Sequence, residues 1–420
     1  MTRVVGLDIG DGVLRAAEVK DPARARPTVV KYHEVPIPHG AVSKGEVIDR
    51  DAVVAGIRAL WSQGKFSTKD VVLGMGNHRI LARDHVVRAQ PIDRIREQLP
   101  FQVQDLLPVP VNDALLDFYP VSTEQTDQGP MVHGLLVAAI RDAVLGNVEA
   151  AEAAGLHVAE VDLIPFALTR LLLGAHSGMT ALVDIGASTT YVVLANNGVP
   201  HFMRVIPSGG RDITDALVAA HDVPFGEAER IKRTIGIQTR ALTAEAQPLA
   251  ATIGSATHEL LMSVRNTISY FATARPNTPV QRVVMSGGGG DMPGIRGAHP
   301  TSGEQRRSRS PRLDRQGSPR RPVAGVAVRG RRTRGWEHSM TVDIPTRAPE
   351  QAQPSGDRRR GLRSSGPARS RPIGKFPLTV GGEPRANLLP PEIILKRKQL
   401  KTRRALRAGV LLVALTTAAG

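Results

Sequence analysis

Apolar and polar positions follow two different periods along residues 1–295. Short runs rich in valine, isoleucine and leucine have the length of buried strands, whereas longer segments repeat their apolar residues with the spacing of a helix. Strands and helices that alternate in this way are typical of sheets covered by helices, so we expect an α/β fold. The predicted strands span residues 4–9, 13–19, 71–74, 134–140, 181–185, 190–195 and 280–286, and the predicted helices span 52–63, 91–104, 141–154, 213–221, 225–235 and 252–274.

One pattern occurs twice in this region. An apolar strand leads into Asp8-Ile-Gly10-Asp11-Gly12, and a second one, 176 residues later, leads into Asp184-Ile-Gly186-Ala-Ser188-Thr189-Thr190. A further apolar strand follows each turn. Solenoid repeats have periods of up to about 50 residues, so this spacing excludes a solenoid. The pattern instead predicts two related halves that face each other.

The two Asp-Ile-Gly turns have the residue types of phosphate-binding loops. A glycine directly after a buried strand lets the backbone bend sharply and bring its N–H groups close to an anionic oxygen. An aspartate at the strand end, Asp8 or Asp184, can hold a hydrated magnesium ion. A single turn of this kind can equally be an ordinary β-turn, whereas two copies on matching strands favour phosphate binding.

Three further features could complete a ligand site, although each has a simpler reading. Gly209-Gly210 forms a glycine turn before a predicted helix. Glu229 and Lys232 share one face of another predicted helix and could contact a ribose and a base, or form an ordinary surface ion pair. The run Gly287-Gly288-Gly289 allows close approach to a flat ligand such as adenine, or serves as a flexible linker.

Charge and composition change after residue 295. Residues 1–295 contain 27 basic and 31 acidic side chains, whereas residues 296–420 contain 28 basic and 8 acidic ones. Residues 296–375 are dominated by arginine, serine, proline and glycine, so we expect a disordered linker there. The basic segment lacks interleaved aromatic residues, which argues against specific nucleic-acid binding. The chain has no cysteine, which excludes disulfides and zinc–thiolate sites.

Residues 376–420 form the third predicted region, after 1–295 and 296–375, and we expect ordered structure there again. Residues 393–420 have helical propensity, and residues 408–420 are apolar but shorter than the roughly 20 residues of a spanning helix. Basic residues at 396–398 and 401–404 precede this run and resemble a positive-inside flank. We therefore expect a truncated membrane anchor at this end.

The order of these motifs resembles the actin-like ATPase superfamily, which includes actin, Hsp70, MreB and FtsA. The resemblance implies two lobes, with ATP and Mg²⁺ in the cleft between them. It also implies that Glu229 and Lys232 meet the nucleoside and that the glycines after residue 286 meet the adenosine. The implied nucleotide-binding residues are Asp8, Gly10, Asp11, Gly12, Asp184, Gly186, Ser188, Thr189, Thr190, Gly209, Gly210, Glu229, Lys232, Gly287, Gly288 and Gly289, with Asp8 and Asp184 holding Mg²⁺ through water.

Residues of about 35–120 narrow the resemblance. They include Pro36-Ile-Pro-His-Gly, Gly45-Glu-Val-Ile-Asp and Leu107-Pro-Val-Pro, and they resemble the inserted subdomain of the PilM family of type IV pilus assembly, which is related to FtsA. The resemblance covers roughly residues 1–295. It implies a cytoplasmic scaffold, at the inner face of the inner membrane, that works with other platform proteins. We expect the second lobe to begin near residue 180 and to be incomplete after Gly294.

The C-terminal sequence resembles a second family of the same machine. Asn387-Leu388-Leu389-Pro390 precedes a basic helix and an apolar run, as at the N-terminus of the PilN family, whose peptide docks on PilM. The resemblance implies that this chain binds a PilN-type peptide, in trans or in cis. A solvated loop is the simpler reading. The stretch 296–375 is then either a genuine linker or the product of a frameshift or fusion of adjacent genes.

One departure from the superfamily bears on catalysis. Hydrolysing relatives have a Glu-Pro pair near the attacking water, whereas this sequence has Ile164-Pro165. Isoleucine cannot orient or deprotonate water, so we expect ATP to be bound but hydrolysed weakly or not at all. The alternatives are a small-molecule kinase of the same superfamily, for which Asp162 is the candidate carboxylate, and an FtsA-like cell-division protein.

Overall fold

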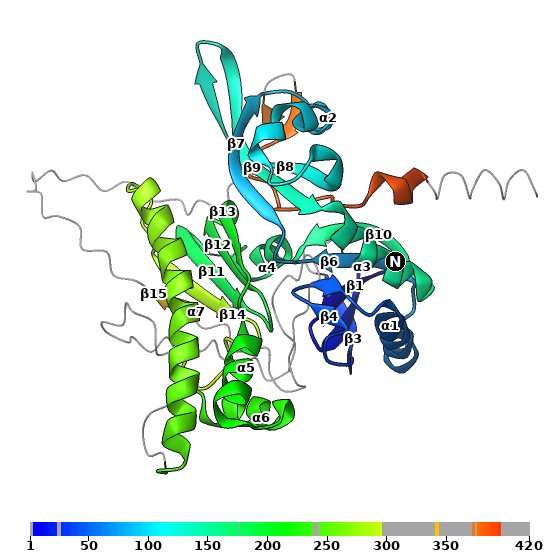
Figure 1. The fold of residues 1–420 in the computed structure, drawn as a ribbon. Helices are drawn as coiled ribbons and strands as arrows, with labels where there is room; N and C mark the ends of the chain where they lie inside the picture. The colour runs from blue at the N-terminus through cyan, green and yellow to red at the C-terminus, as the bar shows by residue number, and fades with distance from the viewer. Residues whose placement is uncertain are drawn as a thin grey trace, which may run out of the picture.

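The computed structural model describes residues 3–22, 27–174, 176–237, 243–295, 341–343, 372–373 and 376–395. Within these residues, two five-stranded sheets form the centres of two lobes, and a three-stranded sheet projects beside them. Figure 1 shows the first lobe in blue, the second in green and yellow, and the smaller sheet in cyan above both.

The first lobe is built on the strand order β10-β6-β1-β2-β3. Strands β1 (Arg3–Gly10), β2 (Val13–Lys20) and β3 (Thr28–Pro36) form an antiparallel meander, and β6 (Asp70–Met75) and β10 (His157–Leu163) continue the sheet in parallel. Helices α1 (Arg50–Gly64) and α3 (Arg141–Ala153) pack against this lobe, with the small hairpin β4 (Val42–Ser43) and β5 (Glu46–Val47) near them. The Asp49 carboxylate accepts a hydrogen bond from the Ala52 amide, 3.0 Å away, and so caps α1.

The second lobe repeats this arrangement. Strands β11 (Met179–Ile185), β12 (Thr190–Asn196) and β13 (Val199–Ile206) form the meander, and β14 (Arg282–Ser286) runs parallel to β11. Helices α5 (Gly210–His221), α6 (Phe225–Ile235) and α7 (Ala246–Ala274) cover one face. Figure 1 shows α7 running the full height of this lobe, with α5 and α6 at its lower end.

The register confirms that the two halves are related. Asp8 in β1 lies opposite Arg15 in β2 and beside Gly74 in β6. Asp184 in β11 lies opposite Tyr191 in β12 and beside Ser286 in β14. Both aspartates therefore hold the same position at the carboxyl end of a central strand, as the repeated motif predicts.

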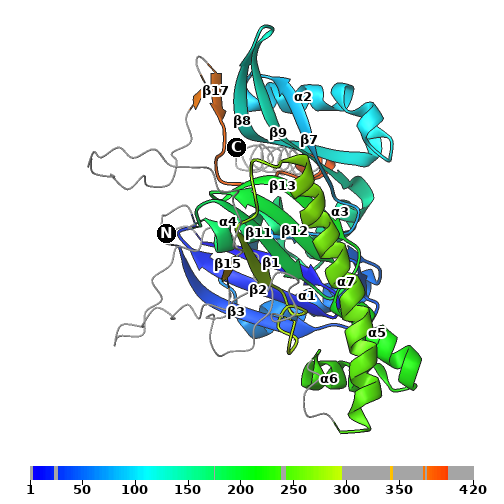
Figure 2. The ribbon, with the colours of Figure 1, turned by 90° about the vertical axis from the view of Figure 1, so that its left-hand side faces the viewer.

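Helix α4 (Ile164–Leu173) joins the two lobes. It contacts β10 of the first sheet and β11, β12 and β13 of the second. Tyr191 and Val193 of β12 are fully buried in the same apolar cluster as Leu73 of β6. The lobes therefore share one apolar core. Figure 2 shows α4 beside β11 in this part of the molecule.

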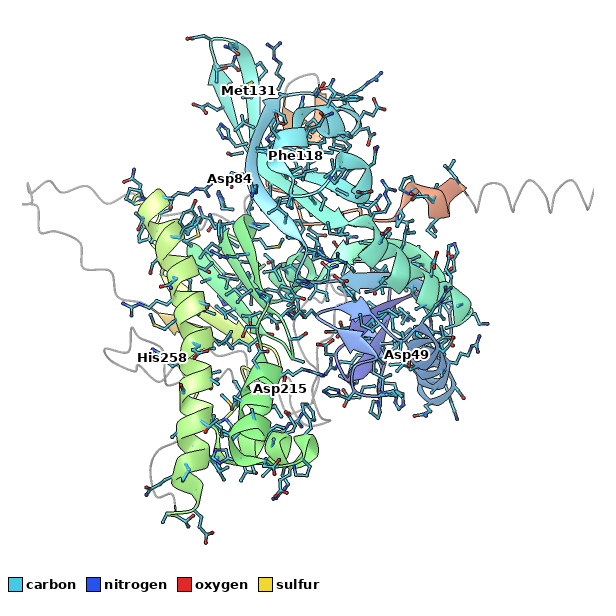
Figure 3. All side chains as sticks on the ribbon, in the orientation of Figure 1. Asp49, Asp84, Phe118, Met131, Asp215 and His258 are labelled. Atoms are coloured by element: carbon cyan, nitrogen blue, oxygen red, sulfur yellow. The ribbon has the colours of Figure 1, made fainter. Side chains whose placement is uncertain are left out.

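The third sheet, β7-β9-β8, forms a separate subdomain with its own core. It consists of β7 (Leu81–Arg88), β8 (Ala114–Thr126) and β9 (Gly129–Ile140), with α2 (Ile92–Gln102) and two short 3₁₀ turns (Gln104–Leu106 and Val111–Asp113). Its bounds differ from the expected insertion at about 35–120, because α1 and β6 belong to the first lobe and the sheet continues to residue 140. Figure 3 shows Phe118 in this subdomain and Asp84 at its base, where Asp84 forms an ion pair at 2.6 Å with Arg275, the residue that directly follows α7.

The C-terminal part returns to the body of the protein. Strand β15 (Thr341–Asp343) adds to the edge of the second sheet beside β14, and β16 (Pro372–Ile373) pairs with β17 (Phe376–Thr379). Two short strands therefore lie within the stretch 296–375, where we expected disorder. Residues 391–395 are helical, and the predicted basic flank and the apolar run 408–420 lie outside the described residues. None of the helices in the described ranges combines the length and apolar character that crossing a membrane requires.

Candidate functional site

A cavity of about 980 Å³ opens between the two lobes. Most of its lining comes from five segments that are far apart in the sequence: the β1–β2 turn, the loop after β11, the first turn of α5, one face of α6 and the glycine turn after β14. Glu34 of β3 and Gly45 between β4 and β5 complete it. Of the predicted nucleotide residues, those in the lining are Gly10, Asp11, Gly12, Gly186, Ser188, Thr189, Gly210, Glu229, Lys232, Gly288 and Gly289. Asp8, Asp184, Thr190, Gly209 and Gly287 lie behind this lining.

Asp8 lies just beneath the first turn and is 2% exposed. Its Oδ2 is 3.3 Å from Nη1 of Arg15, and its buried Oδ1 accepts no hydrogen bond from any described residue. Because a buried carboxylate oxygen is stable only with a partner, this atom suits a hydrated magnesium ion, whose ligands are carboxylates and waters. The described residues contain no cluster of three or more acidic or histidine side chains that would hold a metal on their own. That Asp8 and Asp184 hold Mg²⁺ through water stays a prediction.

The second turn is held by its own backbone. The Gly186 amide donates to the Thr189 carbonyl at 2.9 Å, which leaves Ser188 and Thr189 facing the cavity. The Thr190 hydroxyl donates to the Ser208 carbonyl at 2.8 Å, so Thr190 braces the neighbouring loop. Asp184 is fully buried below the turn, as Asp8 is below the first.

The glycines behind the lining allow three loops to meet. The Gly210 amide donates to the Gly186 carbonyl at 2.9 Å, and a Cβ added at Gly209 would lie 2.6 Å from the Ala187 carbonyl oxygen. Gly287 has φ +86°, and a Cβ there would collide with the backbone of Ile185. Any side chain at Gly209 or Gly287 would push these loops apart.

Glu229 and Lys232 form a buried network at the wall of the cavity. The Lys232 ammonium donates to the Gly210 carbonyl (2.7 Å), the Thr214 hydroxyl (2.7 Å) and the Glu229 carboxylate (2.6 Å). Burial alone would raise the pKa of Glu229, but the Lys232 charge and hydrogen bonds from Lys232, Thr214 and Arg233 lower that pKa to about 2. Burial lowers the pKa of Lys232. Since all three ammonium hydrogens are used, Lys232 ties α6 to the start of α5, and its predicted contact with a nucleoside stays a prediction.

Three arginines that line the cavity were missed by the sequence analysis: Arg15, Arg211 and Arg233, of which Arg233 pairs with Glu229. Arg15 lies opposite Asp8 in the β1–β2 ladder, and its Nε is also 3.6 Å from Glu34. Arg211 stacks on Phe225, with its guanidinium carbon 5.6 Å from the ring centre, and donates to His39 Nε2 at 2.7 Å. His39 belongs to the first lobe and Arg211 to the second, so this contact crosses the cavity mouth. Sequence could have indicated Arg15 alone, because a tight β1–β2 hairpin places it opposite Asp8.

A second site lies on the other side of α4, where residues 381–393 cross β8 and β10. Two buried carboxylates bind this segment. Asp117 of β8 accepts the Asn387 amide at 2.6 Å, and Asp162 of β10 accepts the Ala386 amide at 3.0 Å. Each carboxylate is also paired with an arginine. Arg96 lies 2.7 Å from Asp117, and Arg170 lies 2.5 Å from Asp162.

Backbone and apolar contacts complete this groove. The Leu388 amide donates to the Val161 carbonyl at 3.0 Å, as an added strand residue would. The Leu388 side chain is 1% exposed, and Ala386 and Ile393 are buried in the same cluster of the first lobe. Arg141 pairs with Glu392, and Arg170 also donates to the Pro384 carbonyl. We call the surface formed by Asp117, Val161, Asp162 and Arg170 the peptide groove.

One hydroxyl connects the cavity to the core behind it. The Tyr191 hydroxyl donates to the Gly76 carbonyl at the end of β6 and lies 3.3 Å from the Thr189 hydroxyl of the second turn. The Ile164 side chain, at the start of α4, packs on Gly74 and Gly76. Ile164 follows Asp162 of the peptide groove by two residues, so this series of contacts, which begins at the second turn, ends close in sequence to the groove.

Two sheets with the same meander, paired aspartate–glycine turns and a cavity between them define the actin-like ATPase fold. The family model described as "Type IV pilus assembly protein PilM" matches residues 6–299. The chain therefore belongs to the PilM family.

Two individual comparisons agree with this placement. The chain is similar to a solved structure described as "PilM-PilN type IV pilus biogenesis complex", at 26% sequence identity and a TM-score of 0.60, over 70% of this chain and 83% of that one. It is also similar to the cell division protein FtsA of Bacillus subtilis (strain 168), 24% identical over 229 residues, which are 48% of this chain and 51% of FtsA. The chain spans about half the length of that curated relative.

Proposed function

We propose that this protein is an ATP- and magnesium-binding scaffold of type IV pilus assembly. Its family membership supports the assembly role, and the paired turns around the cavity support nucleotide binding. The backbone of Gly10–Gly12 and the hydroxyls of Ser188 and Thr189 would hold the phosphates, with Arg15 and Arg211 supplying positive charge. Bound Mg²⁺ would neutralise phosphate charge beside Asp8. In this proposal the protein acts at the cytoplasmic face of the inner membrane, together with other proteins of the pilus assembly platform.

Hydrolysis is expected to be weak. Ile164, the first residue of α4, stands where hydrolysing relatives of the superfamily have a glutamate, and its side chain is buried against the end of β6. An apolar side chain cannot take a proton from water. ATP would therefore act by its binding, which shifts the balance between open and closed lobes through a difference in affinity for the two forms.

The peptide groove is proposed to accept a PilN-type Asn-Leu-Leu-Pro peptide. The observation that carries this proposal is the pair of buried carboxylates, Asp117 and Asp162, which accept consecutive backbone amides of Ala386 and Asn387. The chain's own residues 387–390 occupy the groove in cis. In the similar solved complex, PilM is described together with PilN.

Calorimetric titration of Mg·ATP into the full chain tests the nucleotide site. We expect saturable binding of one nucleotide, which Asp8→Ala abolishes. Asp51→Ala, at an exposed position in the first turn of α1 of the same lobe, serves as the control and should bind normally. Failure of the native chain to bind Mg·ATP would refute the proposed nucleotide role.

Competition with a labelled Asn-Leu-Leu-Pro peptide tests the groove. In the native chain the intramolecular segment should exclude the peptide, because a tethered segment has a high effective concentration. Leu388→Asp should release that segment and let the labelled peptide bind, whereas the same change at the exposed Leu395 should not. Equal binding by the two variants would contradict occupation of the groove in cis.

The position of Asp162 argues against the alternative of a small-molecule kinase. Its carboxylate binds Arg170 and the Ala386 amide, and it is not among the residues that line the cavity. It therefore serves the peptide groove and is poorly placed to activate an acceptor in the cleft. The similarity to FtsA keeps an FtsA-like cell-division protein as the second candidate.

A further inference from the structure

An apolar side chain from the C-terminal segment is buried in the core of the projecting subdomain. Leu378 is 1% exposed and belongs to the cluster that α2 forms with the three-stranded sheet. The cluster consists of Val87, Ile95, Leu99, Val103, Phe118, Val132, Leu136 and Leu378. Its other members lie within residues 87–136, so this core takes a side chain from a segment more than 200 residues away in sequence.

The residues around Leu378 show the alternation of a strand on an apolar surface. Val380 also packs against the cluster, whereas Thr379 between them is exposed. Such alternation places every second side chain on one face. The segment thus presents Leu378 and Val380 to the subdomain core and Thr379 to solvent.

A glycine bend joins this contact to the peptide groove. Gly381 has φ +63°, and its amide donates to the Pro120 carbonyl at 3.0 Å. The Tyr119 hydroxyl then donates to the Gly382 carbonyl at 2.6 Å. From there the chain reaches Asp162 and Asp117. Figure 2 shows β17 beside β8 and the segment passing from it beneath the small sheet.

We propose that peptide recognition in this protein has two anchors: the Asn-Leu-Leu-Pro motif in the peptide groove, and an apolar residue nine positions before its asparagine, seated in the projecting subdomain. This inference rests on the proposed peptide-binding function. The occupant is the chain's own segment from Leu378 to Ile393. A partner peptide would compete well only if it carried both an apolar pair, spaced like Leu378 and Val380, and a glycine bend before the motif.

The two anchors should strengthen each other. The segment between them, residues 381–385, is short and fixed by backbone hydrogen bonds, so docking one anchor holds the other near its site. Removing a buried leucine side chain should weaken the upstream anchor by a factor of roughly ten to a hundred. If the contact of Leu378 contributed nothing to docking, removing its side chain would leave the affinity of the Asn-Leu-Leu-Pro motif for the peptide groove unchanged.

Hydrogen exchange of the full chain tests this proposal directly. We expect Leu378→Ala to speed exchange at the Gly381 amide and in α2 at least tenfold, and to speed exchange at the Leu388 amide by a smaller factor. Thr379→Ala, one residue away and exposed, should leave all three unchanged. Unaltered exchange at Gly381 and in α2 of Leu378→Ala would overturn the upstream anchor.

Binding in trans provides the second measurement. The full chain carrying Leu378→Asp and Leu388→Asp would be titrated with peptides of residues 376–393 and 383–393. The longer peptide should bind at least tenfold more tightly, and Leu378→Asp within that peptide should remove the gain. Equal affinities would refute the anchor alone. Absence of binding by both peptides, with no protection of the Leu388 amide in the native chain, would refute the groove and the anchor together.

Discussion

The buried network of Glu229, Lys232, Thr214 and Gly210 allows a quantitative prediction. Glu229→Ala would leave the Lys232 ammonium buried beside two neutral hydrogen-bond partners and without its paired carboxylate, so that the weaker influence of the Asp215 charge remains. Lys232 is 7% exposed, so water cannot readily replace the lost carboxylate. The consequence should be a large loss of stability in the second lobe, because a buried charge without its counter-charge is strongly unfavourable.

The size of this loss can be obtained in two ways, one from the pKa of Glu229 and one from the usual cost of breaking a buried ion pair. A pKa of about 2 for Glu229, against an ordinary value of 4.5, corresponds to about 3 kcal/mol at about 1.4 kcal/mol per unit. Removing one partner of a buried pair typically costs about 3–5 kcal/mol. Glu229 is partly exposed at 27%, so the lower end, about 3 kcal/mol, is expected.

Urea unfolding, followed by hydrogen exchange in α5 and α6, would measure the loss. Glu227→Ala is the matched control, because Glu227 lies on the same helix and its ion pair with Arg230 is exposed at both ends. That change should cost less than about 1 kcal/mol. A loss for Glu229→Ala as small as that of the control would show that the network contributes little.

The same network predicts a dependence on pH. The folded-state pKa of Glu229 is lowered, so its contribution is complete above the ordinary pKa of 4.5 and is lost as pH falls toward about 2. The stability difference between the native chain and Glu229→Ala should therefore shrink between pH 4.5 and 2. A difference that stayed constant over this range would contradict the assignment of the lowered pKa to folding.

Three further changes test other contacts. Tyr191→Phe leaves the Gly76 carbonyl without its hydroxyl partner and should cost about 1–3 kcal/mol in thermal unfolding, with weaker Mg·ATP binding in calorimetry. Gly287→Ala should destabilise the second lobe by more than about 2 kcal/mol in urea unfolding, because φ is +86° and the methyl group meets the Ile185 backbone, whereas Gly288→Ala, with open space around it, should be nearly neutral. Asp49→Ala should cost about 1 kcal/mol, measured as faster exchange in the first turn of α1, because it removes the cap of that helix.

Sequence reasoning succeeded where local pattern and tertiary environment agree. The two Asp-Ile-Gly hairpins, β1–β2 and β11–β12, are mostly apolar and mostly buried, and helix α6 spans the predicted residues 225–235. Several elements were missed. Strand β3 alternates irregularly and carries Lys31, His33 and Glu34, and its stability comes from pairing with β2. Helix α4 is buried on nearly all sides between the lobes, so its sequence shows no polar stripe.

Local sequence pattern also predicted those parts of the site that lie within a single turn. Residues within one turn, such as Gly10–Gly12, are adjacent in sequence and could be found there. Arg211 becomes part of the cavity only through the packing of α5 against the second turn. Asp117 and Asp162 bind a segment more than 200 residues away, and no local pattern indicates such a contact. The origin of residues 376–420 as a PilN-like fusion stays a prediction.

The docking of residues 378–393 on the chain that carries them has a consequence for assembly. The same hydrogen bonds and buried side chains would form if the segment of one molecule entered the groove of another, so the two arrangements differ only in how the chains are connected. Exchange of this segment between neighbours is therefore nearly neutral in contact energy. The local concentration of the protein would then decide whether the segment docks on its own chain or on a neighbouring one. The number of linked molecules would therefore rise with protein concentration.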